Sequence, residues 1–332
     1  MGCPVGIGPE IILKFFALSR NWTSLPFPVV VIGNRKILEW CRRSLNIPAS
    51  IADWKPGDVL QEGVIPVFEP EISPVLNCSL LQWGSPDKAT GLAMARYIET
   101  AVELTQREVL GGIITCPIAK STLNMAGYAY PGHTEMLAAL CKTSNYAMMM
   151  AGEKLRVTLV TIHTGLAQVP QALSIEKIMH LIRLTADSLQ SDFCISSPRI
   201  AVAGLNPHAG EDGLFGDEEK TMILPAIGKM KKIGCNVDGP YPPDTLFYKA
   251  AGGAFDAVVC MYHDQGLIPF KLLHFEDGVN VTIGLPVVRT SVDHGTAYDI
   301  AGQGKADPAS LVAAVNMSAS IVTRRNIGFT HK

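Results

Sequence analysis

The sequence predicts an α/β protein built around a largely parallel sheet. Apolar segments of strand length alternate along the chain with segments of helical periodicity, which is typical of repeated strand–helix–strand units. The chain has 332 residues, enough for two domains. Hydrophobic residues make up 48% of it and charged residues 17%, the composition of a globular protein with a large core.

In the first half of the chain, short runs rich in Val and Ile alternate with segments whose apolar residues recur every three or four positions. These patterns predict strands over 27–34, 65–69 and 111–120, and helices over 35–45, 89–108 and 133–141.

The second half of the chain continues the same alternation. We expect strands over 155–165, 199–210, 255–266 and 279–285, and helices over 174–190, 217–232 and 306–324. Ser174 is the expected N-cap of its helix, because a serine hydroxyl accepts hydrogen bonds from first-turn N–H groups.

Composition also excludes several classes of partner. The net charge is −2 and there is no long basic run, so neither nucleic acid nor an anionic membrane is the expected partner. The longest apolar stretches are strand-sized and no signal peptide is evident. The eight cysteines are scattered without a C-x-x-C pair, so we expect reduced thiols in a cytoplasmic protein.

Polar side chains follow four of the predicted strands at the point where each strand ends. A histidine follows three of these strands: His163, His208 and His263. In open α/β sheets, ligands bind beyond the carboxyl ends of strands, where loops from distant segments converge. Three neutral imidazoles meeting there could bind a divalent metal and leave positions open for substrate.

A second interpretation of these histidines stays open at this point. A single histidine after a strand is commonly an ordinary turn residue, and spacings of 45 and 55 residues match no local metal motif. After the last of these strands the chain reads YHDQG, where Asp264 could orient an imidazole, bind substrate or simply occupy a turn that continues through Gly266 toward Lys271.

Other local signals are weaker. GIGPE over 6–10 is either an anion-binding turn or a helix start with Pro9 in its first turn. PGHTE over 131–135 places His133 and Thr134 at a helix start, where Thr134 could serve only as a cap. Neither a G-x-G-x-x-G fingerprint after the first strand nor a P-loop is present.

Taken together, the motifs resemble one family, the 4-hydroxythreonine-4-phosphate dehydrogenases (PdxA enzymes) of vitamin B6 biosynthesis. The resemblance runs from residue 2 to about residue 320. It is carried by GxPxGIGPE, PGHTE, GLNPHAGEDGLFGDEE, YHDQGLIPFK, GVNVTIGLP and RTSVDHGTAYDIAGQGKADP, which occur in the family's order.

The resemblance implies a fold like that of isocitrate and isopropylmalate dehydrogenases, with two α/β domains, a cleft between them and a homodimer with sites at the subunit interface. Residues 1–125 with 290–332 would form the cofactor-side domain, and 126–289 the domain for metal, substrate and dimerisation. The loop DHGTAYDIAGQG would bind NAD or NADP in place of a Rossmann fingerprint, with His294, Gly295, Asp299 and Gly302 as its candidate residues.

The resemblance also assigns roles to individual residues. His163, His208 and His263 would hold a divalent metal (Zn, Mg or Co), completed with help from the dimer partner. The candidate residues for a small phosphorylated substrate are His133, Thr134, Lys271, Asn280 and Arg289, and the candidate catalytic residues are Lys271 and Asp264.

The implied reaction is oxidation of the C3 hydroxyl of 4-phosphooxy-L-threonine, followed by loss of carbon dioxide to give 3-amino-2-oxopropyl phosphate. One alternative is a dehydrogenase of 4-phosphothreonate or 4-phosphoerythronate. Two further alternatives are a metal-dependent binding or regulatory protein without turnover and a metal hydrolase, which would not need the HGTAYDIAG loop.

The chain departs from the family at its start. Members usually have a strand before the GxPxGIGPE turn and an acidic residue at the position of Cys3, whereas only Met1 and Gly2 precede Cys3 here. We expect a chain extended upstream by such a strand to be more stable, because a central strand buries apolar surface on both faces.

Overall fold

The computed structural model describes residues 1–18, 22 and 24–330, and it confirms an α/β protein. The chain divides into two compact units. Unit 1 comprises Met1–Ser144 and Leu285–Thr323, and unit 2 comprises Asn145–Gly284 and the residues from Arg324 on. The first change of unit lies between Ser144 and Asn145. The helix His133–Leu140 thus belongs to unit 1, where it packs against Lys88–Gln106.

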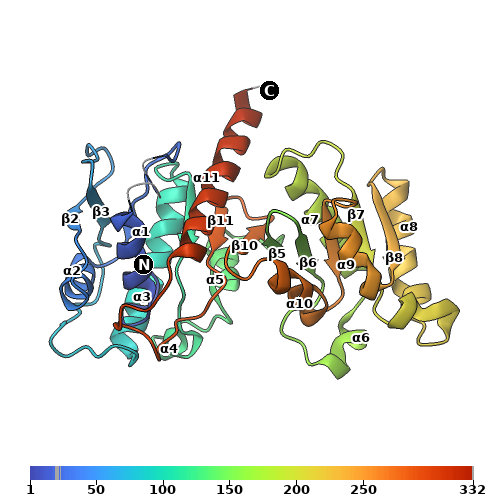
Figure 1. Cartoon of the computed structure of the whole chain (residues 1–332), viewed down its shortest axis with the longest axis horizontal. Helices are drawn as coiled ribbons and strands as arrows, with labels where there is room; N and C mark the ends of the chain where they lie inside the picture. The colour runs from blue at the N-terminus through green and yellow to red at the C-terminus, as the bar shows by residue number, and fades with distance from the viewer. Residues whose placement is uncertain (19–21, 23, 331–332) are drawn as a thin grey trace. The chain divides into compact units, whose positions relative to one another are not determined.

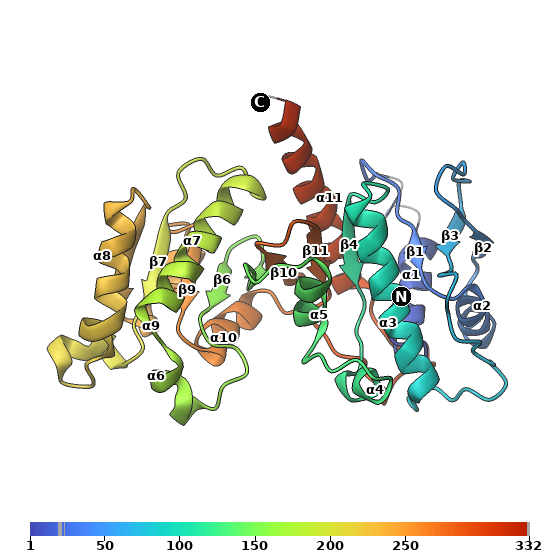
Figure 2. The same cartoon turned by 180° about the vertical axis from the view of Figure 1, so that it is seen from behind.

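Unit 1 contains two sets of parallel strands (Figures 1 and 2). The first set is β1 (Val31–Ile32), β3 (Val64–Phe68) and β2 (Ser50–Asp53), paired in that order. In the second set, β4 (Gly112–Thr115) pairs with β11 (Val288–Ser291).

The strand expected over 27–34 is much shorter in the structure. Only Val31 and Ile32 pair with β3, and Phe27 is partly exposed. Pro28 has no N–H to donate to a neighbouring strand, so the first part of this apolar run cannot join the ladder.

Six helices belong wholly or mainly to unit 1. They are α1 (Gly8–Ala17), α2 (Arg35–Ser44), α3 (Lys88–Gln106), α4 (Lys120–Met125), α5 (His133–Leu140) and α11 (Ala309–Thr330). Side chains fix two of the helix starts. Asn34 accepts a hydrogen bond from the Ile37 N–H, and Asp87 forms a reciprocal capping box with Thr90.

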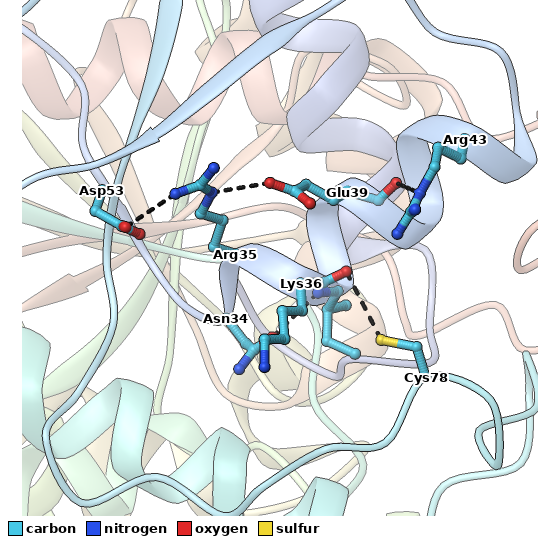
Figure 3. Close-up of polar contacts among 8 residues, drawn as sticks. Asn34, Arg35, Lys36, Glu39, Arg43, Asp53 and Cys78 are labelled. Carbon is cyan, nitrogen blue, oxygen red and sulfur yellow. Dashed lines mark hydrogen bonds and ion pairs between the residues drawn. The ribbon is translucent and has the colours of Figure 1, made fainter.

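The polar face of α2 is tied to the neighbouring strand β2. Arg35 lies between Glu39, at 2.8 Å, and Asp53, at 2.9 Å (Figure 3). On the same helix the Arg43 side chain donates to the Glu39 carbonyl, and Cys78 donates to the Lys36 carbonyl. Ion pairs that are this exposed contribute little to stability, so the group mainly orients α2.

Unit 2 is built around six strands in the order β10-β5-β6-β9-β7-β8. Their bounds are β5 (Ala147–Ala151), β6 (Arg156–Leu159), β7 (Ile200–Ala203), β8 (Val237–Tyr241), β9 (Ala257–Cys260) and β10 (Val279–Ile283). The strands β6, β9, β7 and β8 run parallel, whereas β5 is antiparallel to both of its neighbours.

Helices cover both faces of this sheet (Figures 1 and 2). They are α7 (Ile175–Ser191), α8 (Leu224–Lys232), α9 (Pro243–Ala251) and α10 (His263–Leu273), and the short helix α6 (Val169–Ala172) lies on the connection between β6 and α7. The chain passes from β6 through α7 to β7 and through α8 to β8, moving toward one edge of the sheet. It then returns through α9 to β9 and through α10 to β10, moving toward the other edge. Because such crossovers are right-handed, the two pairs of helices lie on opposite faces. The predicted cap is confirmed, since the Ser174 hydroxyl accepts from the Lys177 N–H.

One hydrophobic core of unit 2 lies between the sheet and the helices α9 and α10. Val157, Leu159, Val258 and Phe270 are completely or almost completely buried there. Gly266 lets α10 approach closely, because a Cβ at this position would lie 2.9 Å from the Leu159 side chain and 3.0 Å from the Cys260 sulfur.

The strand expected over 255–266 ends at Cys260, and the alternative that Asp264 occupies a turn is wrong. Helix α10 begins at His263 and continues to Leu273, with Pro269 inside it. None of the helices that the structure describes is both long enough and apolar enough to cross a membrane.

Candidate functional site

The three candidate histidines follow three neighbouring parallel strands of unit 2. His163 lies beyond β6, His263 beyond β9 and His208 beyond β7, and these strands pair in the order β6-β9-β7. The pairing places Leu159 beside Cys260 and Val202 beside Val259, so the three strands end at the same edge. The structure therefore confirms that these strand ends converge.

Two of the histidines lie next to each other. The ring centroids of His163 and His263 are 6.3 Å apart, with the ring planes tilted by 32°. His263 Nδ1 is 2.7 Å from Asp264 Oδ1. A proton on Nδ1 satisfies this contact and leaves Nε2 as a lone-pair donor, which is how carboxylates orient metal-binding histidines.

The third histidine lies on a loop with unusual backbone geometry. His208 belongs to the turn Pro207–Gly213, where the five residues from His208 to Asp212 all have positive φ angles, between 41° and 85°. Its ring packs near Phe215, with centroids 6.2 Å apart.

The complete metal-binding set stays a prediction. Within residues 1–18, 22 and 24–330, no three histidine, cysteine, aspartate or glutamate side chains lie close enough together to hold a metal ion. The donor chemistry of the His163–His263 pair nevertheless fits two ligands of one divalent ion, since both are imidazoles and Asp264 supports one of them.

Helix α10 carries two more candidate residues of unit 2. Asp264 is exposed and Lys271 is half-buried. They are seven residues apart, two helical turns, so they lie on the same side of the helix. Asn280 lies on β10, opposite Met150 of β5. Its Oδ1 is buried and has no hydrogen-bond partner among the residues described, which makes it an acceptor suited to a ligand.

In unit 1, Arg289 is a buried cation on β11. Its side chain is 3% exposed, and Nη2 donates to Thr115 Oγ1 at 2.7 Å. Burial lowers the pKa of the guanidinium to about 10, and the nearby Glu135 carboxylate partly opposes this shift. A buried guanidinium is strongly stabilised by an anion, and it matches carboxylate and phosphate groups bidentately.

His133 and Thr134 begin α5 in the same unit. Burial holds the pKa of His133 well below its usual range, and the positive charge of Arg289 lowers it further. His133 is therefore neutral at physiological pH. Capping by Thr134 is wrong, because Gly132 occupies the N-cap position and no side chain caps this helix start.

The candidate cofactor loop leaves β11 and contains His294, Gly295, Asp299 and Gly302. A Cβ at Gly295 would meet nothing within 4 Å, so the backbone there is open. Gly302 has a φ of 72°, and a Cβ on it would lie 2.4 Å from the Trp83 indole, which itself stacks on Trp40. At this position, backbone conformation and close packing both favour glycine.

Helix α1 holds the end of this loop through two residues that sequence reasoning missed. Glu10 is fully buried and accepts from the Gly304 and Ala306 N–H groups at 3.3 and 2.8 Å. Lys14 pairs with Glu10 at 2.9 Å and donates to the Gly304 and Ala306 carbonyls. The available signal was the GIGPE motif, which serves as a helix start with Pro9 in the first turn and whose Glu10 side chain supports the loop.

The N-terminal turn also contacts the loop. Ile7 donates its N–H to the Thr296 carbonyl, and the Tyr298 hydroxyl donates to the Cys3 sulfur at 3.4 Å. Burial raises the pKa of the Cys3 thiol, so this residue is uncharged.

Comparisons with known proteins were consistent along the chain. The family model described as "Pyridoxal phosphate biosynthetic protein PdxA" matches residues 25–318. A 4-hydroxythreonine-4-phosphate dehydrogenase of Desulfosudis oleivorans is 53% identical over 96% of this chain and 93% of the relative. A D-threonate 4-phosphate dehydrogenase of Cupriavidus necator is 44% identical over 98% and 96%.

A solved structure shows the same likeness. The crystal structure of 4-hydroxythreonine-4-phosphate dehydrogenase from Klebsiella pneumoniae has a TM-score of 0.89 and 42% identity, and the match covers 97% of this chain and 96% of that one.

The lowered pKa of His133 predicts a pH dependence of stability. Below about pH 6.5 the unfolded chain binds a proton on this imidazole that the folded chain does not, so acidification stabilises the unfolded state. In His133→Gln, the fall in melting temperature between about pH 7.5 and about pH 5.5 should therefore be smaller than in the wild type. His180→Gln, a variant of an exposed histidine on α7, controls for losing an imidazole. An unchanged fall in His133→Gln would contradict the assignment.

Proposed function

The chain belongs to the family of the pyridoxal phosphate biosynthetic protein PdxA, and on that premise we propose that it is a 4-hydroxythreonine-4-phosphate dehydrogenase of vitamin B6 biosynthesis. The observation that carries the proposal is the similarity to dehydrogenases of that name along nearly the whole chain. The proposed substrate is 4-phosphooxy-L-threonine, and the proposed oxidant is NAD or NADP.

The proposed reaction has two steps. In the first, a hydride leaves C3 of the substrate for the nicotinamide ring while the C3 hydroxyl loses its proton, which gives a 3-keto acid and reduced cofactor. In the second, the bond between C2 and the carboxylate breaks. Carbon dioxide leaves, and protonation of the resulting enol yields 3-amino-2-oxopropyl phosphate.

We assign the metal to His163 and His263, with His208 as the third ligand. A bound divalent ion would supply Lewis acidity, which lowers the pKa of a coordinated hydroxyl and stabilises negative charge on oxygen. Imidazole ligands suit Zn and Co better than Mg. Asp264 keeps the His263 ring in its ligating orientation through the 2.7 Å contact with Nδ1.

Lys271 is the proposed proton acceptor or charge partner at the C3 oxygen. It lies on the same side of α10 as Asp264, and the helix is anchored in the core by Phe270. An ammonium group there would stabilise an oxyanion, and its neutral form would accept the hydroxyl proton.

The phosphate and carboxylate of the substrate need partners with positive charge or donor groups. Arg289, His133 and Thr134 are the proposed partners in unit 1. The buried guanidinium of Arg289 supplies charge, and His133 supplies a neutral imidazole N–H. Asn280 of unit 2 offers its buried Oδ1 to the substrate's ammonium group.

The loop with His294, Gly295, Asp299 and Gly302 is the proposed NAD or NADP site. The open backbone at Gly295 would let the cofactor approach the chain closely, and Glu10 and Lys14 fix the far end of the loop. We also propose a cytoplasmic location, in keeping with eight free cysteines, and no nucleic-acid or membrane partner.

We further propose a homodimer that uses the outer face of α10. Ile268, Leu272, Leu273 and Phe275 are exposed apolar residues on this helix and directly after it. Clustered apolar side chains in water favour association. Because the same helix carries His263 and Lys271, a second copy bound here would lie close to the proposed site.

A second candidate substrate is D-threonate 4-phosphate, favoured by the 44% identity to the Cupriavidus enzyme of that name. It carries a hydroxyl where the first candidate carries an amine on C2. The two substrates would share the metal, cofactor and phosphate residues.

The function is tested by following reduced nicotinamide absorbance. With 4-phosphooxy-L-threonine, NAD or NADP and a divalent metal, we expect turnover that a chelator abolishes. Turnover only with D-threonate 4-phosphate would select the second candidate. Absence of turnover with every substrate, in a folded protein, would refute the dehydrogenase proposal.

Replacing Lys271 tests its catalytic role. Lys271→Met should lower kcat by about 10²- to 10⁴-fold, the usual effect of losing a general acid or base. Lys249→Met, at an exposed lysine on α9, is the matched control and should retain wild-type kcat. Near-normal turnover by Lys271→Met would exclude the role.

The dimer surface is tested by placing a charge in it. Leu272 is 84% exposed, and Leu272→Asp should convert the dimer to monomers in light scattering after size-exclusion chromatography. Val75 is 92% exposed in unit 1, so Val75→Asp controls for adding an acidic group. A Leu272→Asp protein that stays dimeric would show that the interface lies elsewhere.

A further inference from the structure

A buried glutamine joins two of the strand ends that deliver the candidate metal ligands. Gln265 is 6% exposed and is the third residue of α10. Its Oε1 accepts from the Met261 N–H at 2.7 Å, and its Nε2 donates to the Gly204 carbonyl at 2.6 Å. Met261 lies two residues before His263, and Gly204 lies four before His208.

A buried threonine joins the third strand end to the same point. Thr161 lies two residues before His163, and both its Oγ1, at 2.7 Å, and its backbone N–H, at 3.2 Å, donate to the Met261 carbonyl. Both backbone polar groups of Met261 are thus bound, the N–H by Gln265 and the carbonyl by Thr161. The ends of β6, β9 and β7 are therefore linked through side chains beyond the last residues of each strand.

The link continues into the loop that carries His208. Glu219 is 2% exposed, and its Oε1 accepts from the Leu205 and Asn206 N–H groups at 2.7 and 2.8 Å. These two residues directly follow Gly204. A Cβ on Gly204 would lie 2.8 Å from the Ala209 Cα, so the loop folds tightly back on this point.

The Gln265 and Thr161 contacts are specific because they are buried. A buried amide that loses one partner leaves a polar group unsatisfied, which is costly, so both ends of Gln265 have defined partners. The amide is also asymmetric, since only Oε1 can accept from Met261 and only Nε2 can donate to Gly204. Gln265 therefore fixes the relative position of the two backbone segments that lead to His263 and His208.

We propose that Gln265, assisted by Thr161, is a positioning residue that holds the backbone preceding His163, His208 and His263 and thereby supports the metal affinity of these histidines. This inference rests on the proposed function, because it assumes that these histidines bind a divalent ion. Gln265 contacts none of the three imidazoles, so it acts through the backbone that precedes each of them. Supporting residues of this kind usually change metal affinity by about 10- to 100-fold.

The test is Co²⁺ binding to metal-free full-length protein, measured by titration calorimetry and by the visible absorption of the bound ion. Gln265→Met keeps the side-chain length and removes both hydrogen bonds, so the dissociation constant for Co²⁺ should rise about 10- to 100-fold, with an altered absorption spectrum. Thr161→Val should raise it less, because the Thr161 N–H still donates to the Met261 carbonyl. If Gln265→Met does not fold, Thr161→Val decides the question.

A matched control separates positioning from general destabilisation. Thr185 is a fully buried residue of α7 whose hydroxyl donates to the Leu181 carbonyl and contacts the Thr158 hydroxyl of β6 at 3.0 Å, and it takes no part in the Gln265 and Thr161 contacts described above. Thr185→Val also loses a buried hydrogen bond and should lower the melting temperature without changing Co²⁺ affinity or spectrum.

The outcomes distinguish the inference from the function beneath it. Wild-type Co²⁺ binding that is equally strong in Gln265→Met and Thr161→Val would overturn the positioning role and leave the proposed function intact. Equal loss of affinity in Thr185→Val would also overturn it, because stability alone would then explain the effect. A wild-type protein that binds no Co²⁺ would overturn both the metal assignment and this inference.

Discussion

The parallel register of β6, β9 and β7 is the constraint on which the candidate site of unit 2 depends. The register places Leu159 beside Cys260 and Val202 beside Val259, so three segments far apart in the sequence end at one edge. A slip by one residue would turn each side chain of a strand to the other face of the sheet, where it would pack against different helices. The position of the histidines is therefore set by the hydrophobic core and refined by the polar contacts beyond it.

The two units contribute different chemistry. Unit 2 offers neutral imidazoles on strand ends, together with Lys271 on α10. Unit 1 offers a buried guanidinium inside a strand, whose pKa is lowered to about 10, and beside it an imidazole that its positive charge helps keep neutral. Metal chemistry needs unprotonated nitrogen donors, whereas anion binding needs donors and positive charge. Keeping His133 unprotonated limits the positive charge that is buried around Arg289.

The sequence was sufficient to predict the features that repeat along the chain. It was insufficient to predict those that depend on tertiary contacts. Alternating apolar runs correctly predicted the α/β class and the convergence of the histidine-bearing strand ends. The same runs could not show that Pro28 shortens β1, or that α10 begins at His263. Five successive residues with positive φ around His208 were not predictable, since four of them are not glycine. Gln265 and Glu10 lie within the motifs YHDQG and GIGPE, but their hydrogen-bond partners are set by the tertiary fold.

Unit 1 is assembled from two stretches of chain that are separated by most of unit 2. Lys14 and the Ala306 carbonyl, which hold the candidate cofactor loop, are 292 residues apart. During synthesis, residues 145–284 are complete before the second stretch of unit 1 has left the ribosome, so unit 2 can acquire its core first. Until Gly304 and Ala306 arrive, Glu10 lacks the amides that satisfy it in the finished protein. Because a contact between residues so far apart in the sequence forms slowly, we expect the contact between α1 and the loop to close late in folding.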